Sequence, residues 1–341
     1  MKKTIFTLMV LTLFCAKIQS QDFFWKAGVY SFFDNVEFSG SEYKMSQTMS
    51  GIQAVPEVGI KFDTVHLISA GGNALHEFGG MAAVERFYPV IYYEFDRKPY
   101  RFLMGAFPRS MALDKYPRVF FQDSVSYFRP NMNGVFWEIS GRKGYVNLWL
   151  DWTGQRSPTE REAFFAGVSG RYGAGIFYLQ HFDYMFHYAK DFDPIVDRGI
   201  HDNMLTLTSA GIDLSGLTFL DRLDINAGWL AGVERARAEN SGWLVNSGFF
   251  METRLAYKRV GVFNSLYAGD AQMKFYADHG NGLYWGDPAY RAGNYNRTDL
   301  CVDFINSGRV RLNLTYSLHF AEGNVYHEQL LKAQIMLNNI K

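Results

Sequence analysis

Apolar and polar side chains alternate with a period of two near the C-terminal end of the chain. Between Arg309 and Ala321, one face carries only Val, Leu, Tyr and Phe, and the other carries Arg, Asn, Thr, Ser and His. Successive side chains of a β-strand point to opposite faces, so this stretch is predicted to be a strand. A soluble sandwich would turn the apolar face to a core, and a membrane barrel would turn it to lipid.

The same pattern recurs along the chain and predicts an all-β fold of about 16 strands, with 14 to 18 as the range. Short turns alternate with longer connections, of which 270–298 is expected to be the longest. Pro130 interrupts one long stretch, so only its second half, 134–140, is expected at membrane level. The predicted strands are 23–33, 54–62, 66–76, 87–95, 100–107, 119–140, 145–152, 161–169, 173–186, 203–214, 220–233, 243–257, 260–269, 299–305, 309–321 and 326–340.

The N-terminus has the three parts of a secretory signal peptide. A basic head, Met1-Lys2-Lys3, precedes an apolar run over 4–16, and the small residue Ser20 stands before Gln21. The run is shorter than the roughly 20 apolar residues of a spanning helix, so we expect residues 1–20 to be a cleaved leader. Residues 21–341 are then expected to form a single domain that is periplasmic, secreted or inserted in an outer membrane.

Composition narrows the function classes. The formal net charge is zero, which gives no case for nucleic-acid binding. One cysteine, Cys301, remains after the leader, so an internal disulfide is not expected. Aromatic residues make up 17% of the chain and there are 32 glycines, which suits many short strands joined by turns. The absence of a fixed-period repeat disfavours a propeller or a solenoid.

With this leader, the period-two strands and the segregation of short turns from long loops, the chain resembles Gram-negative outer-membrane β-barrel proteins of the porin-like kind. The resemblance covers nearly the whole mature chain. It implies a transmembrane, antiparallel up-and-down β-barrel in the cell outer membrane, in contact with outer-membrane lipid and small hydrophilic solutes. It also allows a homo-oligomer.

If the apolar faces meet lipid, the polar faces line a lumen. A Lys or Arg on the lipid face costs ~2–4 kcal/mol at the bilayer midplane, which fixes the phase of each strand. A barrel of about 16 strands is wide enough for an aqueous channel. The alternative is that these charges pair with one another and only brace the wall. The residues expected to line the pore are Glu57, Lys61, Glu138, Asn147, Asp151, Asp224, Glu252, Arg254, Arg311, His319 and Lys332.

The connection 270–298 is the candidate for narrowing the channel. It is rich in tyrosine, which argues against plain disorder, and long loops in compact proteins are usually functional or disordered. We expect it to fold into or over the mouth, with its acids facing the basic wall residues Arg254 and Arg311. The alternative is a surface loop whose tyrosines pack on each other. Its charged residues are Asp270, Asp278, Asp287, Arg291 and Arg297.

Candidates for catalysis are few. The chain has no Gly-x-Ser-x-Gly and no His-Glu-x-x-His motif, so neither a nucleophile elbow nor a zinc site is expected, and no cofactor is implied. A passive channel for small hydrophilic solutes is therefore the expected function, and an enzyme is not. A barrel lipase or protease and an adhesin, or a partner of a surface lipoprotein, are the alternatives. The imidazole and acid candidates are His76-Glu77, His181, His187, His201-Asp202 and His327-Glu328.

The interior of the barrel separates these alternatives. An open bore across the full height of the wall favours a channel. A plugged bore with His, Ser and Asp in hydrogen-bond reach at the outer rim favours catalysis.

Overall fold

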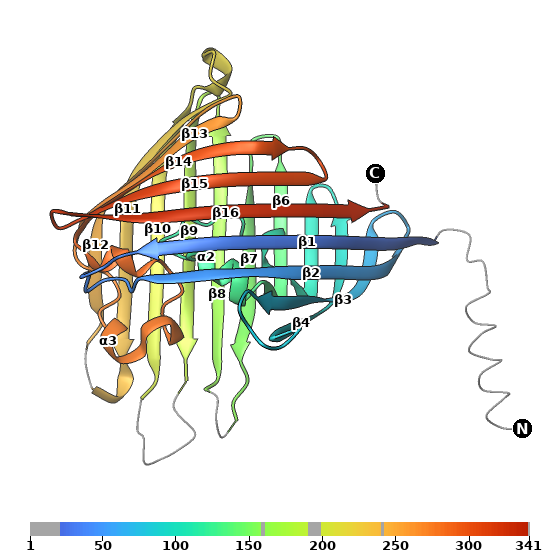
Figure 1. The fold of residues 1–341 in the computed structure, drawn as a ribbon, viewed down its shortest axis with the longest axis horizontal. Coiled ribbons are helices and arrows are strands. Elements are labelled where there is room, and N and C mark those ends of the chain that lie inside the picture. Colours follow the sequence, from blue (N-terminus) through green and yellow to red (C-terminus); the bar gives the residue numbers. More distant parts are fainter. Residues whose placement is uncertain (1–20, 158–160, 190–198, 240–241, 340–341) are drawn as a thin grey trace, which may run out of the picture.

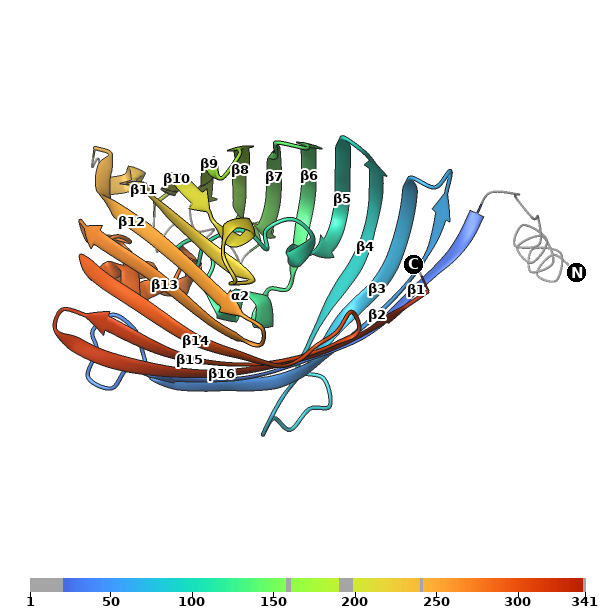
Figure 2. The ribbon, with the colours of Figure 1, turned by 90° about the horizontal axis from the view of Figure 1, so that it is seen from above.

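A computed structural model describes residues 21–157, 161–189, 199–239 and 242–339, and within them sixteen antiparallel strands form one closed barrel. Each strand pairs with the next, and β16 pairs with β1 to close the ring (Figures 1 and 2). The predicted leader, 1–20, lies outside the described residues. The strands are β1 (Gln21–Glu37), β2 (Gln47–Phe62), β3 (His66–Glu77), β4 (Arg86–Arg97), β5 (Tyr100–Pro108), β6 (Asn131–Gly141), β7 (Gly144–Gly154), β8 (Ala163–Ala174), β9 (Phe177–Tyr188), β10 (His201–Asp213), β11 (Arg222–Ala236), β12 (Leu244–Tyr257), β13 (Val260–Gly269), β14 (Asn294–Asn306), β15 (Val310–Ala321) and β16 (Asn324–Asn338).

Helical segments of the described residues are short and lie in the connections. None of them has the length and the apolar composition needed to cross a membrane. They are η1 (Arg109–Met111), α2 (Asp123–Phe128), η2 (Ser215–Leu217), η3 (Arg237–Glu239), α3 (Tyr276–His279), η4 (Gly280–Gly282) and η5 (Pro288–Arg291).

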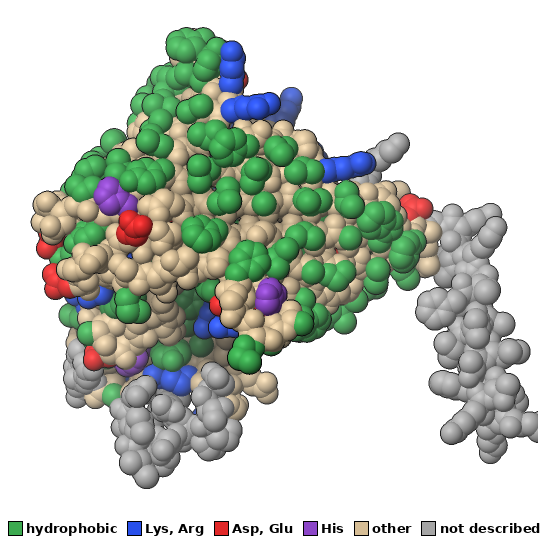
Figure 3. Space-filling model, viewed as in Figure 1, with side chains coloured by type: hydrophobic (Ala, Val, Ile, Leu, Met, Phe, Trp, Pro, Cys, Tyr) green, Lys and Arg blue, Asp and Glu red, His purple; other side chains and the backbone are tan. Residues whose placement is uncertain are grey.

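Over most of each strand, the outward side chains are more exposed than the inward ones. In β10, for example, Leu205, Leu207 and Ser209 are buried, whereas Met204 and Thr208 are exposed. Figure 3 shows hydrophobic side chains spread over the outer face of β14–β16 and β1, with the charged side chains near its edges. The apolar rows therefore face outward, and the prediction of a barrel instead of a two-sheet sandwich is confirmed.

The two ends of the barrel differ in their connections. The start of β1 and the end of β16 lie on the short-turn side of the barrel. The long connections 38–46, 109–130 and 270–293 lie on the opposite side, which we call the long-loop side. The expected strict segregation is wrong in two places. Glu322 and Gly323, both at positive φ, make a tight turn on the long-loop side, and the connection 214–221 on the short-turn side holds a 3-10 turn.

Several predicted boundaries are also wrong; β2, for example, begins at Gln47 instead of residue 54. The strand expected over 119–140 is strand only from Asn131, because the preceding residues leave the wall and enter the lumen. Residues 170–172, between the predicted strands 161–169 and 173–186, are part of β8, and the chain reverses instead at Gly175, whose φ is +64°. Finally, β14 begins at Asn294, so the long connection is 270–293.

Candidate functional site

The connection between β5 and β6, residues 109–130, crosses the inside of the barrel. Figure 2 shows α2 enclosed by the curve of the sheet. The Tyr116 hydroxyl donates to the carbonyl oxygens of Val168 and Asp183 at 3.2 and 3.1 Å, and it accepts from Trp149 Nε1 at 2.8 Å. One side of the inward segment is therefore fixed to β7, β8 and β9.

The other end of this segment docks on β1 and β2. The rings of Tyr127 and Phe32 are stacked, with centroids 4.1 Å apart. The Tyr127 hydroxyl donates to Asp34 Oδ2 at 3.2 Å, and Gln53 Nε2 donates to the Tyr127 carbonyl oxygen at 2.6 Å. Because both tyrosines are anchored on different walls, residues 109–130 span the lumen.

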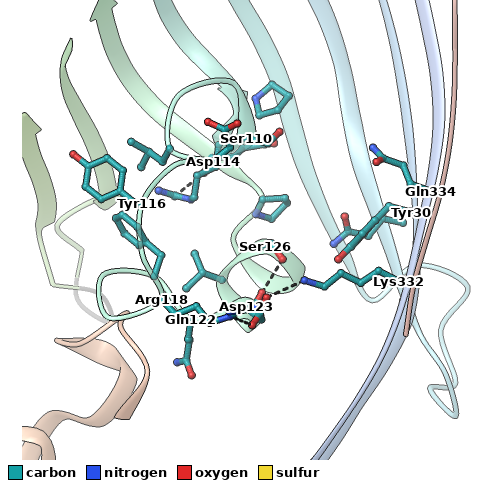
Figure 4. Close-up of a pocket in the computed structure, with 18 of the residues that line it drawn as sticks. Tyr30, Ser110, Asp114, Tyr116, Arg118, Gln122, Asp123, Ser126, Lys332 and Gln334 are labelled. Atoms are coloured by element: carbon teal, nitrogen blue, oxygen red, sulfur yellow. Dashed lines mark hydrogen bonds and ion pairs between the residues drawn. The ribbon is translucent and has the colours of Figure 1, made fainter. Parts of the chain in front are cut away.

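Asp123, the first residue of α2, lies near three positively charged side chains inside the barrel. Its carboxylate lies 2.7 Å from Arg118 Nε, 2.8 Å from Lys332 Nζ and 3.9 Å from Arg297 Nη2. Burial alone would raise the pKa of the Asp123 carboxyl, but the charges of Arg118, Lys332 and Arg297 outweigh it and hold the pKa well below its usual range. Figure 4 shows Arg118, Asp123 and Lys332 directed toward one another.

A second group of buried charges surrounds Arg297 on β14. The Arg297 guanidinium lies 2.7 Å from Asp299, 3.4 Å from Glu328 and 3.7 Å from Asp287. Glu328 is also 3.2 Å from His319 Nε2, and all these side chains are nearly or fully buried. A buried charge is tolerated when it is paired and hydrogen-bonded, so this network ties β14, β15 and β16 to the connection 270–293.

Residues 270–293 fill the long-loop half of the lumen and interlock with the first inward segment. Gln122 N donates to the Trp285 carbonyl oxygen at 2.8 Å, and Asp287 N donates to the Arg118 carbonyl oxygen at 3.0 Å. Tyr284, Trp285 and Tyr290 are exposed by 3% or less. This half of the barrel therefore resembles a packed protein core, not a water-filled mouth.

A cavity of about 650 Å³ lies beside the inward segment. Its lining includes Tyr30 and Lys332 from the wall and Asp123 and Ser126 from α2 (Figure 4). Wall residues near the terminal ends of β1 and β16, such as Met336, also line it, so the cavity extends toward the short-turn end. Its lining combines apolar surface with several charged and polar side chains, as is usual in sites that bind small molecules.

At the long-loop rim, β9 and β10 bring an imidazole and a carboxylate together. His187 Nδ1 lies 3.1 Å from Asp202 Oδ1, and the Arg237 guanidinium contacts Asp202 through two nitrogens, at 2.6 and 3.0 Å. The His187 ring lies 5.2 Å from that of Phe164, which stacks on Trp152. We call His187, Asp202 and Arg237 the rim cluster. Within the residues that the structure describes, no group of three or more His, Cys, Asp or Glu is arranged to hold a metal ion.

Comparison with known proteins assigns the family. The family model described as lipid A 3'-O-deacylase-type matches residues 16–333, which is nearly the whole chain. The chain belongs to this deacylase-type family. A search of curated proteins gives no match.

Solved structures similar to this deacylase-type barrel are outer-membrane porins. A loop-deletion mutant of OmpT from Vibrio cholerae is 8% identical, with a TM-score of 0.57 over 93% of this chain and 100% of that one. OprB from Pseudomonas putida is 7% identical, with a TM-score of 0.52 over 96% of each chain. OccK2 of Pseudomonas aeruginosa, solved with glucuronate, is 11% identical, with a TM-score of 0.53 over 94% and 99%. At such identities the likeness is one of fold, and it confirms the predicted porin-like outer-membrane barrel.

In this deacylase-type barrel, the eleven predicted lining residues all share the inward phase of their strands. Lys61 and Glu138 are half-buried and Arg311 is exposed near the short-turn end. Most of the others pair within the wall or with the inward segment, and whether they line a conducting pore stays a prediction. The pairs are Glu57 with Lys26, Asn147 with Ser169, Asp151 with Arg109, Asp224 with Tyr178, Glu252 with Arg254, His319 with Glu328 and Lys332 with Asp123.

The predicted constriction loop enters the lumen, but its charges have other partners than expected. Asp287 faces Lys44 and Arg297, at 3.4 and 3.7 Å, instead of Arg254 or Arg311. Arg297 itself is on a strand, β14, and not in the loop. The remaining charges lie apart from each other: Asp270 accepts from Ser247 N, Asp278 is exposed on α3, and Arg291 donates to the Tyr43 carbonyl oxygen.

Sequence reasoning missed the inward segment 109–130 and therefore its key residues, Tyr116, Arg118, Asp123 and Tyr127. A signal was present, because Pro117 and Pro130 bracket a stretch without strict alternation. Proline within a run disfavours a central strand.

Proposed function

We propose that this protein is an outer-membrane hydrolase that removes an ester-linked acyl chain from a lipid A-type glycolipid. The proposal departs from the passive channel expected from the sequence. The observation that carries it is a lumen packed with protein at the long-loop end, combined with an imidazole–carboxylate pair at the rim on that side. The family match supports the same substrate class.

The rim cluster has the groups that general-base hydrolysis needs. Asp202 holds Nδ1 of His187, which leaves Nε2 to take a proton from a water molecule. The resulting hydroxide attacks the ester carbonyl carbon. The tetrahedral intermediate then expels the sugar alkoxide, which takes the proton back from His187, so the products are a free fatty acid and a sugar hydroxyl.

The surroundings of the rim cluster suit a phosphorylated lipid. The Arg237 side chain is 48% exposed and directs only two of its five N–H groups at Asp202, so the others can bind a phosphate or the developing oxyanion. Phe164 and Trp152 offer an apolar surface beside His187, at the level where aromatic residues of outer-membrane barrels meet lipid headgroups.

The test is release of fatty acid from purified lipid A in mixed micelles, followed by mass spectrometry. We expect His187→Ala and Asp202→Asn to lower the rate by roughly 10²–10⁴-fold, the usual contribution of a general base. His66→Ala is the matched control, because His66 lies at the short-turn end of the barrel. Unchanged activity in both rim variants, or no release by the wild-type protein, would overturn the proposal.

A second function is favoured by the cavity in the lumen. Its volume of about 650 Å³ and its charged lining suit a small hydrophilic solute, and the interlocked segments would then act as the closed gate. Planar-bilayer recordings distinguish the two functions. Steady conductance steps of the wild-type protein, without fatty-acid release, would favour transport over hydrolysis.

A further inference from the structure

Three polar side chains face outward on the wall formed by β8 to β11. His181 and Asp183 lie on β9, where their neighbours Phe182 and Tyr184 point inward and are buried. Thr208 is their exposed neighbour on β10, directly paired with His181 in the register. The side chains of His181 and Asp183 are 42% and 35% exposed, so both reach the surface that contacts lipid.

These groups lie at mid-height in the wall. His181 is four residues from Phe177, which ends β9 on the short-turn side, and Asp183 is four residues from His187 at the rim. A strand rises about 3.4 Å per residue, and barrel strands tilt by about 40°, so each lies ~10 Å from its end of the apolar band. Ionisable side chains at this depth are unfavourable in lipid and usually mark a functional contact.

Hydrogen bonds within the chain satisfy part of this cluster. His181 Nε2 lies 3.1 Å from Asp183 Oδ2, and His181 Nδ1 lies 2.8 Å from Thr208 Oγ1. Val168 N donates to Asp183 Oδ1 at 2.8 Å. The exposed parts of the imidazole and the carboxylate would still face hydrocarbon in a monomer, so the cluster is better accommodated against a polar partner.

Around the cluster, small outward residues on β8, β10 and β11 lie between larger ones, such as Val168 beside Asp183 and Trp229 beside Thr208. Small side chains let two transmembrane surfaces approach closely and form polar contacts. The outward small residues are Ala166, Gly170, Ala210, Ala227 and Ala231.

We infer that this face, centred on His181, Asp183 and Thr208, is the contact surface for a second copy of the chain. Two copies in one membrane share the same orientation, and a two-fold axis along the membrane normal keeps every residue at its depth and brings the same face of both copies together. The polar cluster of one copy therefore meets that of the other. The cluster carries both an acid and a base, so the imidazole of each copy can bond the carboxylate of its partner.

Site-specific photocrosslinking in native outer membranes tests the contact. A benzophenone amino acid at Ala210 should give an adduct at twice the mass of the chain or more, containing peptides of this chain alone. The same probe at Leu314, an outward position on β15, is the control and should give no such adduct. An adduct with a different protein, or with lipid alone, would contradict a second copy as the occupant.

Removing the cluster gives an independent measurement. The double variant His181→Leu/Asp183→Leu should lower the oligomeric fraction at least tenfold in native mass spectrometry from mild detergent, whereas Leu314→Ala should not change it. Heat-modifiable migration on gels shows whether each variant has folded. A wild-type protein that is monomeric in both membrane and detergent, or a folded double variant with the wild-type oligomeric fraction, would overturn the inference.

Discussion

Tyr127 of α2 lies face to face with Phe32 of β1, with ring centroids 4.1 Å apart and ring planes 5° from parallel. Both side chains are fully buried, although α2 belongs to a connection and β1 to the wall. Offset aromatic pairs add to the stability of area burial. This contact holds the inward segment 109–130 across the lumen, and several consequences can be measured.

Tyr127→Ala should release α2 from β1. Truncating a buried aromatic residue typically lowers stability by ~3–5 kcal/mol. Here the loss should fall mostly on the docking of 109–130, because the hydrogen bonds between the strands of the barrel stay intact. Hydrogen exchange of 109–130 should rise sharply in the variant. Tyr172→Ala, at an exposed position on β8, is the control, and equal protection of 109–130 in both variants would contradict this role of the pair.

The docked segment should resist acid. Because the folded-state pKa of Asp123 is depressed below its ordinary value, near 3.9, its ion pairs contribute fully above about pH 4 and are lost only as the pH falls through the depressed value. Hydrogen exchange of 109–130, once corrected for intrinsic rates, should therefore not rise as the pH falls from about 8 to about 5. Asp123→Asn should weaken protection throughout that range, and a loss of wild-type protection near neutral pH would refute the assignment.

Arg297→Met should destabilise the lumen more than any surface substitution of an arginine. The change removes the cation nearest to all three carboxylates and leaves Asp299 with Arg118, and Glu328 and Asp287 with Lys44. Breaking a buried ion pair from one side costs ~3–5 kcal/mol. Urea unfolding in detergent should show the loss. Arg311→Met, on the exposed end of β15, should stay within ~0.5 kcal/mol of wild type, and a similar effect of both would argue against the network.

Arg237→Lys tests the geometry of the rim cluster separately from its charge. Lysine keeps the positive charge but cannot make the paired contacts that Arg237 makes with Asp202. We expect fatty-acid release from lipid A to fall about tenfold, equivalent to ~1.4 kcal/mol, because Asp202 then orients His187 less firmly. Arg222→Lys, at the opposite end of β11, is the matched control. Full activity of Arg237→Lys would remove the guanidinium from the mechanism.

Only part of the rim cluster could be predicted from the sequence. His187 and Asp202 could both be singled out from the sequence as candidates, and the hairpin register pairs them directly. Arg237 could not be added, because it reaches Asp202 from the connection after β11.

The sequence by itself determined the wall of this barrel. The period of two in the sequence separates lipid-facing residues from inward ones. A shift of a strand by one residue would place charged side chains in hydrocarbon. The approximate number of strands and the phase of each could therefore be inferred from short stretches of sequence. Only the tertiary structure decided what fills the lumen. The contacts that hold the inward segment join residues far apart in the chain, such as Tyr127 to Asp34 and Arg118 to Asp299, separated by 93 and 181 positions. Such pairs form only once the barrel has closed and brought distant strands to face one another.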